Sequence, residues 1–288
     1  MKLISFRRSG SASRDEWGVL ADDGIVVLSD AWPRLQDALA TGLPAIAESA
    51  KRSGAARVAL ADVQLLLPVT QPGKIVCVGL NYRSHIAEAG RKESPYPSLF
   101  MRHIGSFVGH GGQMVRPFLS EHFDFEAELA LVIGKRGRHV AEADAREHIA
   151  GYTCAQENSV RDFQKHGPQV TPGKNFDNSG VLGPWIVTAD EMPPLDQVRV
   201  VGRLNGEQMQ DGAVADLIFT VPYLVSYISS FMTLEPGDII LTGTPEGVGS
   251  ARKPQLWMKA GDTYEVEITG IGKLAATVVD EPRESART

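Results

Sequence analysis

The stretch that decides the fold reads Phe123-Asp-Phe-Glu-Ala-Glu-Leu-Ala-Leu-Val-Ile-Gly134. Side chains alternate between the two faces of a strand, so we expect Glu126 and Glu128 on the same face. Two carboxylates that close repel each other unless water screens them or a cation neutralises them. The stretch therefore indicates either a solvated strand edge or a cation site. The apolar run at 129–133 predicts a buried strand, which counts against the solvated edge.

A third acidic residue follows the next strand-like segment. Glu157 comes directly after an apolar run in Gly151-Tyr-Thr-Cys-Ala-Gln-Glu-Asn-Ser-Val-Arg-Asp-Phe-Gln164. Three carboxylates form a hard oxygen site, which suits Mg²⁺, with Mn²⁺ or Ca²⁺ as alternatives, and leaves about three positions for water or substrate oxygens. The sequence contains no cysteine and histidine cluster that would compete for zinc. It therefore predicts a divalent metal site.

A histidine and a glutamate stand three residues apart in Gly79-Leu-Asn-Tyr-Arg-Ser-His-Ile-Ala-Glu-Ala-Gly90, a strand end that leads into a short helix. Residues three apart share one helix face, so His85 and Glu88 can form a hydrogen bond. A carboxylate that orients an imidazole produces a general base able to take a proton from water. The competing interpretation is a surface pair that stabilises the helix by only about 0.2–0.5 kcal/mol.

Two loops carry residues suited to an anionic substrate. Turn formers surround Lys174 in Thr171-Pro-Gly-Lys-Asn-Phe-Asp-Asn-Ser-Gly180, an irregular loop where a lysine can stabilise an enolate or a carboxylate. Small residues in Leu241-Thr-Gly-Thr-Pro-Glu-Gly-Val-Gly249 let backbone N–H groups approach a carboxylate, although a plain strand-exit turn fits equally well. The glycine spacing before Lys174 does not match a nucleotide-binding loop, and no Gly-x-Ser-x-Gly motif supports a serine hydrolase.

The composition is that of an ordinary globular protein. The chain has 288 residues, of which 43% are hydrophobic and 22% charged, and its net charge is −6. Lysines and arginines are scattered, which argues against a nucleic-acid partner. The short N-terminal apolar stretch is interrupted by arginines, so we expect neither a signal peptide nor a membrane span, and a cytoplasmic location. Cys77 and Cys154 lie among apolar residues and are expected to be buried free thiols.

A group of turn formers at 67–73 predicts a boundary between two domains. Residues 1–70 read as short strands followed by two helices, at 30–40 and 44–52, the second closed by Gly54, and would form a small α+β domain. Residues 71–288 would form the catalytic domain. Its expected strands are 74–80, 125–134, 182–188, 198–204, 238–242 and 263–269. Because these strands show no regular βαβ spacing, the predicted fold class is α+β and predominantly β.

One helix of the second domain is well marked. Thr220 can cap it and Pro222 fits its first turn. Its periodicity predicts that Leu224, Tyr227, Ile228 and Phe231 share one face and pack into the core.

Six segments, taken in order, are similar to the motifs of one enzyme family. They are Gly79-Leu-Asn-Tyr with His85 and Glu88; Glu126-Ala-Glu-Leu-Ala; Gly151-Tyr-Thr with Ser159-Val-Arg-Asp-x-Gln164; Gly173-Lys174; Leu204-Asn-Gly206; and Met232-Thr-Leu-Glu-Pro-Gly-Asp with Thr242-Gly-Thr-Pro. On these motifs residues 70–272 resemble the fumarylacetoacetate hydrolase family. The resemblance implies a mixed β-sandwich roll behind a small N-terminal domain, and a homodimer.

The resemblance also implies roles for individual residues. The implied metal ligands are Glu126, Glu128 and Glu157. The implied catalytic groups are His85, Glu88 and Lys174. The implied substrate contacts are Arg102, Gln164 and Thr244. Relatives usually carry Asn-Asp where this chain has Gln156-Glu157, which makes the third ligand one methylene longer and predicts an altered metal geometry or another preferred cation. The segment at 166–178 is longer than in relatives, which predicts a changed substrate choice.

With the roles that the resemblance implies, these residues are expected to belong to an enzyme that acts on a small 2-oxo acid. The expected reaction is metal-dependent hydrolysis of a carbon–carbon bond in a 2,4-dioxo acid such as an acylpyruvate, giving pyruvate and a carboxylic acid. The alternative is decarboxylation, isomerisation or hydration of a related 2-oxo acid, since these reactions would pass through a metal-bound enolate as well. A non-catalytic binder of small dicarboxylates would not need the His85 and Glu88 pair. A structural or interaction protein would show no metal dependence.

Overall fold

The computed structural model describes residues 1–10, 14–52 and 56–283. Within these residues the main element is a 12-stranded mixed sheet. Its main path runs in the order β4 (Arg57–Val58), β3 (Gly24–Val27), β2 (Glu16–Ala21), β1 (Lys2–Arg8), β14 (Gly180–Thr188), β12 (Ile149–Gln156), β11 (Ala127–Ile133), β17 (Ile239–Leu241), β6 (Ile75–Gly79) and β7 (Ser98–Met101). Off this path, β5 (Val63–Leu65) pairs with β1 and β8 (Phe107–Gly109) pairs with β14.

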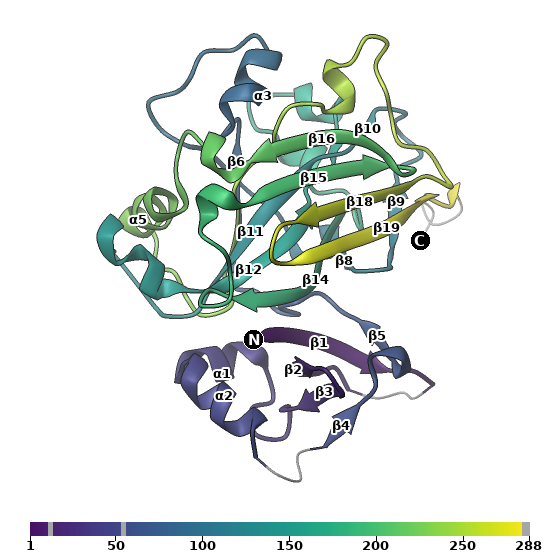
Figure 1. Cartoon of the computed structure of the whole chain (residues 1–288). Helices are drawn as coiled ribbons and strands as arrows, with labels where there is room; N and C mark the ends of the chain where they lie inside the picture. The colour runs from purple at the N-terminus through teal and green to yellow at the C-terminus, as the bar shows by residue number, and fades with distance from the viewer. Residues whose placement is uncertain (11–13, 53–55, 284–288) are drawn as a thin grey trace.

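A second sheet packs against the first to form a sandwich (Figure 1). In the described chain its strand order is β16 (Glu207–Ala213), β15 (Arg199–Leu204), β18 (Thr263–Ile268), β19 (Gly272–Asp280) and β9 (Gln113–Arg116). The core between the sheets contains Leu129 and Leu131 of β11 together with Val200 and Val266 of the smaller sheet. The predicted α+β fold with a predominantly β sandwich is confirmed.

Strand β11 is buried on both faces, as its apolar run predicts. Leu129 and Leu131 point into the sandwich core, whereas Ala130 and Val132 belong to a second core on the other face of the sheet. The second core also contains apolar side chains from the N-terminal helices α1 (Leu35–Thr41) and α2 (Leu43–Ala50). The central strands are therefore covered on one face by the smaller sheet and on the other by these helices.

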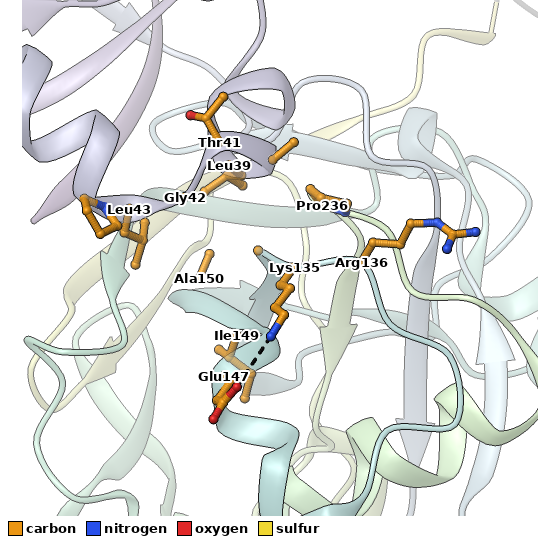
Figure 2. A pocket seen from close by; sticks show the side chains of 13 residues that line it. Leu39, Thr41, Gly42, Leu43, Lys135, Arg136, Glu147, Ile149, Ala150 and Pro236 are labelled. Carbon is orange, nitrogen blue, oxygen red and sulfur yellow. Dashed lines mark hydrogen bonds and ion pairs between the residues drawn. The ribbon is translucent and has the colours of Figure 1, made fainter.

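The N-terminal strands continue the main sheet. β1 pairs with β2 and β5, and Lys2 and Leu3 also pair with β14. The main sheet therefore contains strands from both sides of residue 70. The division of the chain into two domains at this position stays a prediction. Helix α1 begins at Leu35, five residues later than predicted, whereas α2 lies within two residues of its predicted bounds. The predicted cap Gly54 lies outside the described residues. An open cleft of about 580 Å³ separates the turn between α1 and α2 from the turn at 134–136, where Lys135 forms an ion pair with Glu147 at 3.4 Å (Figure 2).

The described residues contain three further α-helices, which are α3 (Arg83–Glu88), α4 (Thr171–Lys174) and α5 (Val221–Phe231). The predicted cap of α5 is confirmed, because the Thr220 side chain accepts a hydrogen bond from the N–H of Tyr223. Leu224 and Ile228 are buried as predicted. The prediction that Phe231 packs into the core is wrong, because its side chain is 49% exposed and lies edge-on to the ring of Tyr227 at the end of the helix.

Two other sequence-based expectations concern cysteines and membranes. Cys77 and Cys154 are both free and buried, as predicted. Among the described residues, none of the helices is both long enough and apolar enough to cross a membrane.

Candidate metal centre

The three glutamates come from neighbouring segments of the main sheet. β11 and β12 are antiparallel with Ala127 opposite Gln156, so the start of one strand lies beside the end of the other. The strand predicted over 125–134 is interrupted here, because β10 (Phe123–Asp124) pairs with β13 (Ser159–Val160) in a separate small sheet. At this crossing the N–H of Glu157 donates to the carbonyl oxygen of Glu126 at 2.9 Å. The interruption places the two side chains next to each other.

The carboxylates of Glu126, Glu128 and Glu157 meet at one point. One oxygen of each lies within 4.8 Å of the others. All three residues are buried, with exposed fractions of 5%, 2% and 1%. An ion bound at about 2.0–2.6 Å from each oxygen would span such separations, and hard oxygen donors are those that Mg²⁺, Mn²⁺ and Ca²⁺ prefer. The structure thus brings the predicted ligands together, and their role as ligands stays a prediction.

Burial and crowding raise the pKa of two of these carboxyls. Burial, followed by the charges of Glu157 and Glu126, raises the pKa of Glu128 well above its ordinary value. Burial also raises the pKa of Glu157, against the opposing charges of Lys174 and Arg102. A divalent cation would neutralise this crowded negative charge, so the donor set and its electrostatics fit a metal.

Glu126 is held ionised by neighbouring cations. Burial opposes ionisation, but the charges of Arg161 and Lys174 outweigh it and lower the pKa of Glu126 to about 2. Nη2 of Arg161 lies 2.8 Å from Oε1 of Glu126, and the hydroxyl of Ser159 donates to the same oxygen. One of the three predicted ligands is therefore charged over the whole physiological pH range.

Lys174 lies among the predicted ligands and is only 2% exposed. Its position lies in the short helix α4, where an irregular loop was predicted. The ammonium group donates to both carboxylate oxygens of Glu126 at 3.1 Å, to the carbonyl oxygen of Glu157 at 3.1 Å and to the Glu157 carboxylate. A lysine has three N–H donors, so a substrate oxygen would have to replace one of these acceptors.

Arg102 is fully committed to protein partners. Its guanidinium makes five hydrogen bonds, to Glu157, the carbonyl oxygen of Asn158, the hydroxyl and carbonyl oxygens of Ser106, and the hydroxyl of Ser179. An arginine has five N–H donors, so in this arrangement none is left for the predicted contact with substrate. The 2.9 Å bond from Nη1 to Oε1 of Glu157 instead fixes the orientation of a predicted ligand.

The structure brings His85 and Glu88 together on α3. Nδ1 of His85 lies 3.1 Å from Oε2 of Glu88, and the other carboxylate oxygen accepts the N–H of Gly247 at 2.9 Å. His85 is 9% exposed, so the pair is not the surface decoration that formed the competing interpretation. The charge of His85 also contributes to the lowered pKa of Glu126, which places the imidazole near the carboxylate cluster.

The two remaining predicted substrate contacts lie beside the cluster. The Thr244 hydroxyl donates to the carbonyl oxygen of Ala127 at 2.9 Å and accepts from Gln210 at 2.8 Å, while the N–H of the preceding Gly243 donates to Glu128 at 2.8 Å. Gly243 has φ +104°, and this conformation brings its amide to the carboxylate. Oε1 of Gln164 accepts from Nη1 of Arg161 at 3.1 Å, and the same arginine contacts Glu126.

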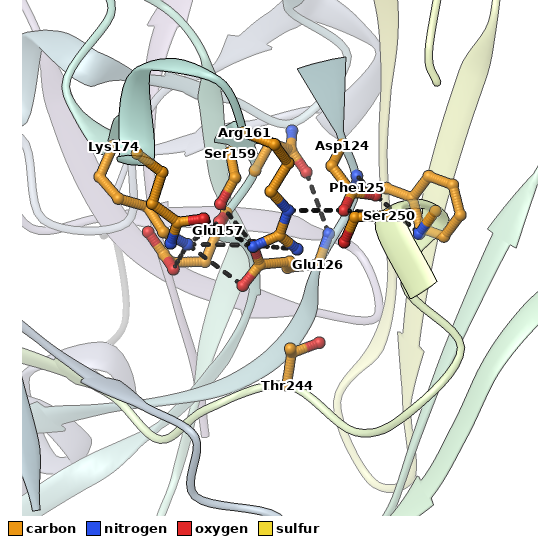
Figure 3. A network of polar contacts seen from close by, with 12 residues as sticks. Asp124, Phe125, Glu126, Glu157, Ser159, Arg161, Lys174, Thr244 and Ser250 are labelled. Atoms are coloured by element: carbon orange, nitrogen blue, oxygen red, sulfur yellow. Dashed lines mark hydrogen bonds and ion pairs between the residues drawn. The ribbon is translucent and has the colours of Figure 1, made fainter. Parts of the chain in front are cut away.

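Sequence reasoning missed the roles of Asp124 and Arg161. Figure 3 shows Arg161 between Asp124 and Glu126, with Nε of the arginine 2.6 Å from Oδ2 of the aspartate. The available signal for Asp124 is its place two residues before Glu126 in a strand-like stretch. Arg161 lies in the Ser159-Val-Arg-Asp segment, but its partner is 37 residues away in sequence and no local pattern joins the two.

Comparison with known proteins gives a family match over most of the chain. The model of the family described as "Fumarylacetoacetate (FAA) hydrolase C-terminal" matches residues 74–279. This range contains every residue of the candidate site.

Two relatives from vertebrates are named as oxaloacetate tautomerases. The mitochondrial oxaloacetate tautomerase of Xenopus laevis is 37% identical over 97% of this chain and 90% of its own length. That of Homo sapiens, also mitochondrial, is 41% identical over 76% of this chain and 70% of its own length.

Solved structures of similar fold include two hydrolases. Fumarylacetoacetate hydrolase from Exiguobacterium antarcticum superposes with a TM-score of 0.84 at 33% identity, covering 98% of this chain and 100% of that one. Maleylpyruvate hydrolase from Sphingobium sp. SYK-6, in complex with manganese(II) and pyruvate, superposes with a TM-score of 0.79 at 30% identity and the same coverage.

Proposed function

Because the chain belongs to the fumarylacetoacetate hydrolase family, we propose that it is a metal-dependent enzyme that interconverts the keto and enol forms of a small 2-oxo dicarboxylic acid such as oxaloacetate. The observation that carries this proposal is the hydrogen bond between the buried His85 and the half-buried Glu88, beside three converging carboxylates. The relatives named as oxaloacetate tautomerases support the substrate class. The proposal ranks isomerisation ahead of the carbon–carbon hydrolysis that the sequence favoured.

Glu126, Glu128 and Glu157 are the residues that would hold the metal, which we propose to be Mg²⁺. When bound there, the ion supplies positive charge beside the oxygens of a 2-oxo acid. Mn²⁺ is the main alternative, since a structural relative contains manganese(II).

His85 is the proposed base. Its Nδ1 atom faces Glu88, so Nδ1–H donates to the carboxylate and Nε2 carries the free lone pair. Nε2 takes a proton from the carbon next to the 2-oxo group, and a proton returned to the 2-oxo oxygen completes the enol, so that the reaction only moves one proton. Glu88 stabilises the imidazolium formed between these two transfers.

Lys174 is the proposed electrostatic partner of the substrate. Its ammonium group is fixed by Glu126 and Glu157, and one N–H can be redirected from a carboxylate to the substrate oxygen on which negative charge gathers. A preorganised donor of this kind stabilises the developing charge without reorganisation.

The proposal is tested by following three products of oxaloacetate in parallel. Enol absorbance, pyruvate and carbon dioxide are recorded with Mg²⁺, with Mn²⁺ and with a chelator. We expect metal-dependent acceleration of the keto–enol equilibration without stoichiometric pyruvate. Pyruvate and carbon dioxide released together would identify a decarboxylase instead, and an equilibration rate equal to that without enzyme would refute the proposed activity.

Hydrolysis of an acylpyruvate is the second candidate. It is favoured by the structural relative that hydrolyses maleylpyruvate and holds pyruvate and manganese(II). In this reaction His85 would take its proton from water rather than from carbon, so the same residues serve both reactions. Parallel assays with an acylpyruvate distinguish the two, because only hydrolysis releases pyruvate together with a second carboxylic acid.

Assembly and location are further proposals. A homodimer follows from the family resemblance and is measured by sedimentation. Cytoplasmic location stays a proposal, and it differs from the mitochondrial location in the names of the vertebrate relatives.

A further inference from the structure

We propose that Asp124 is a positioning residue that sets the place of the His85 and Glu88 pair relative to the metal ligands, acting through the loop that contains Gly247 and Gly249. The inference rests on the proposed function, since it assumes that this pair and the carboxylate cluster act on the same substrate.

Asp124 is held by hydrogen bonds from several segments of the chain. The residue is fully buried, with an exposed fraction of 0%. Oδ1 accepts the N–H of Gly249 at 2.7 Å and that of Phe125 at 2.9 Å, while Oδ2 accepts Nε of Arg161 at 2.6 Å and the N–H of Ser250 at 3.1 Å. Each oxygen therefore accepts from two donors. One donor is the adjacent residue, and the other three lie 37, 125 and 126 residues away in sequence.

Arg161 connects Asp124 to one of the proposed metal ligands, Glu126. The guanidinium that Asp124 holds through Nε reaches Oε1 of Glu126 through Nη2 at 2.8 Å. Its third nitrogen, Nη1, donates to Gln164 at 3.1 Å. A planar guanidinium fixed on two edges has little freedom to rotate, so the Asp124 carboxylate determines where Arg161 meets Glu126.

The loop that contains Gly247 and Gly249 connects Asp124 to the proposed base, His85. The N–H of Gly249 donates to Asp124. Two residues earlier in the chain, the N–H of Gly247 donates to Oε1 of Glu88 at 2.9 Å. Glu88 in turn faces Nδ1 of His85 through its other oxygen. One short loop is thus held at one end by Asp124 and at the other by the carboxylate that orients the base.

The loop that contains Gly247 and Gly249 is tightly packed against other backbone segments. A Cβ atom at Gly249 would lie 1.9 Å from the carbonyl oxygen of Leu256, and one at Gly247 would lie 2.1 Å from that of Met209. Gly247 also has φ +98°, a conformation that favours glycine. Both glycines pack directly against other backbone segments, so a shift of Gly249 is passed on to Gly247 and to Glu88.

The variant that tests the proposal is Asp124→Asn, which keeps the shape but places an NH₂ group opposite Arg161 and Ser250. Its matched control is Asp238→Asn, because Asp238 is also buried, accepts a backbone N–H at 2.7 Å and pairs with Lys74 at 2.7 Å, but lies at the opposite end of β17 from Gly243. We expect Asp124→Asn to lower kcat about 100-fold, the effect of a small misplacement, with KM retained. A wild-type kcat, or a loss equal to that of Asp238→Asn, would overturn the proposal.

A double-mutant cycle with Glu88→Gln separates positioning from a general loss of structure. If Asp124 acts through Glu88, the loss from Asp124→Asn is much smaller when Glu88 is already replaced. Independent, additive losses would contradict the relay. If Asp124→Asn does not fold, Ser250→Pro removes one amide donor to Asp124 without changing the aspartate, and the same cycle applies.

A readout without substrate distinguishes this inference from the proposed function. The imidazole ¹⁵N resonances of His85, assigned with His85→Ala, report its hydrogen bond to Glu88. We expect them to shift in Asp124→Asn and to stay in place in Asp238→Asn. Unchanged His85 resonances in Asp124→Asn would refute the relay, whereas a wild-type protein inactive on every 2-oxo acid would refute only the proposed function.

Discussion

Nζ of Lys174 lies 3.1 Å from both carboxylate oxygens of Glu126, inside the group of side chains that would bind the metal. A lysine at this point offers the carboxylates part of the positive charge that a metal supplies. Lysine and metal therefore share the same acceptors and influence each other's binding.

Replacing Lys174 with Met should strengthen metal binding and weaken catalysis. The substitution removes a positive charge near the ligand oxygens, so the affinity of the site for the metal ion should rise by about tenfold or more. The same change removes the donor proposed for the substrate oxygen, so kcat should fall. Mn²⁺ affinity measured by electron paramagnetic resonance, together with kcat, tests both parts. Weaker Mn²⁺ binding in the variant would contradict this account.

Replacing His85 with Ala should abolish turnover and leave the metal site intact. A positioned general base contributes about 10²–10⁴-fold, and alanine removes it entirely. Glu88→Gln should cause a smaller loss, because the imidazole remains but its charged form loses stabilisation. Steady-state rates and Mn²⁺ binding of both variants give the test. Wild-type turnover by His85→Ala would remove this residue from the mechanism.

Arg102→Lys should destabilise the fold even though it keeps the charge. Lysine has three donors where Arg102 uses five, so at least two buried acceptors lose their partner, at a cost of about 2–4 kcal/mol. Thermal or urea unfolding measures this loss. The control is Arg203→Lys, whose pair with Glu267 at 2.7 Å is partly exposed and should contribute less than about 1 kcal/mol. Equal effects of the two substitutions would show that Arg102 has no special structural role.

Metal binding should strengthen as pH rises. Burial and like charges raise the pKa of Glu128 and Glu157 above the ordinary value of 4.5, so above that pH the folded metal-free chain holds protons that the unfolded chain has lost. By linkage these two groups make the metal-free protein less stable as pH rises through their folded pKa values. Metal binding displaces the same protons, so the rise in melting temperature caused by Mg²⁺ or Mn²⁺ should be larger at about pH 8 than at about pH 6. A rise independent of pH would contradict the raised pKa values.

The sequence was sufficient to predict the fold class and the proximity of Glu126 and Glu128, which follows from their spacing of two residues. The place of Glu157 beside them depends on the antiparallel pairing of β11 with β12, and it was expected only from the family resemblance. The alternation in 123–134 places Glu126 and Glu128 together, and the apolar run of β11 is buried on both faces as expected. The pairing of His85 with Glu88 also follows from a spacing of three within one helix.

What the sequence did not predict depends on contacts between distant segments. The hydrogen bond from Arg102 to Glu157 joins residues that are 55 apart in sequence, and the hydrogen bond from Gly249 to Asp124 joins residues that are 125 apart. The interruption of the strand before Ala127 arises from the pairing of β10 with β13, which local propensity does not encode. Phe231 was placed in the core because helical periodicity does not show where the neighbouring elements end.

The central claim is that Glu126, Glu128 and Glu157 hold one divalent ion, and Mn²⁺ titration followed by electron paramagnetic resonance tests it most directly. We predict one tightly bound ion per wild-type chain, and binding weakened at least about 100-fold by replacing any one of the three glutamates with Gln. Unchanged Mn²⁺ binding in these variants, or no binding by the wild-type protein, would contradict the claim.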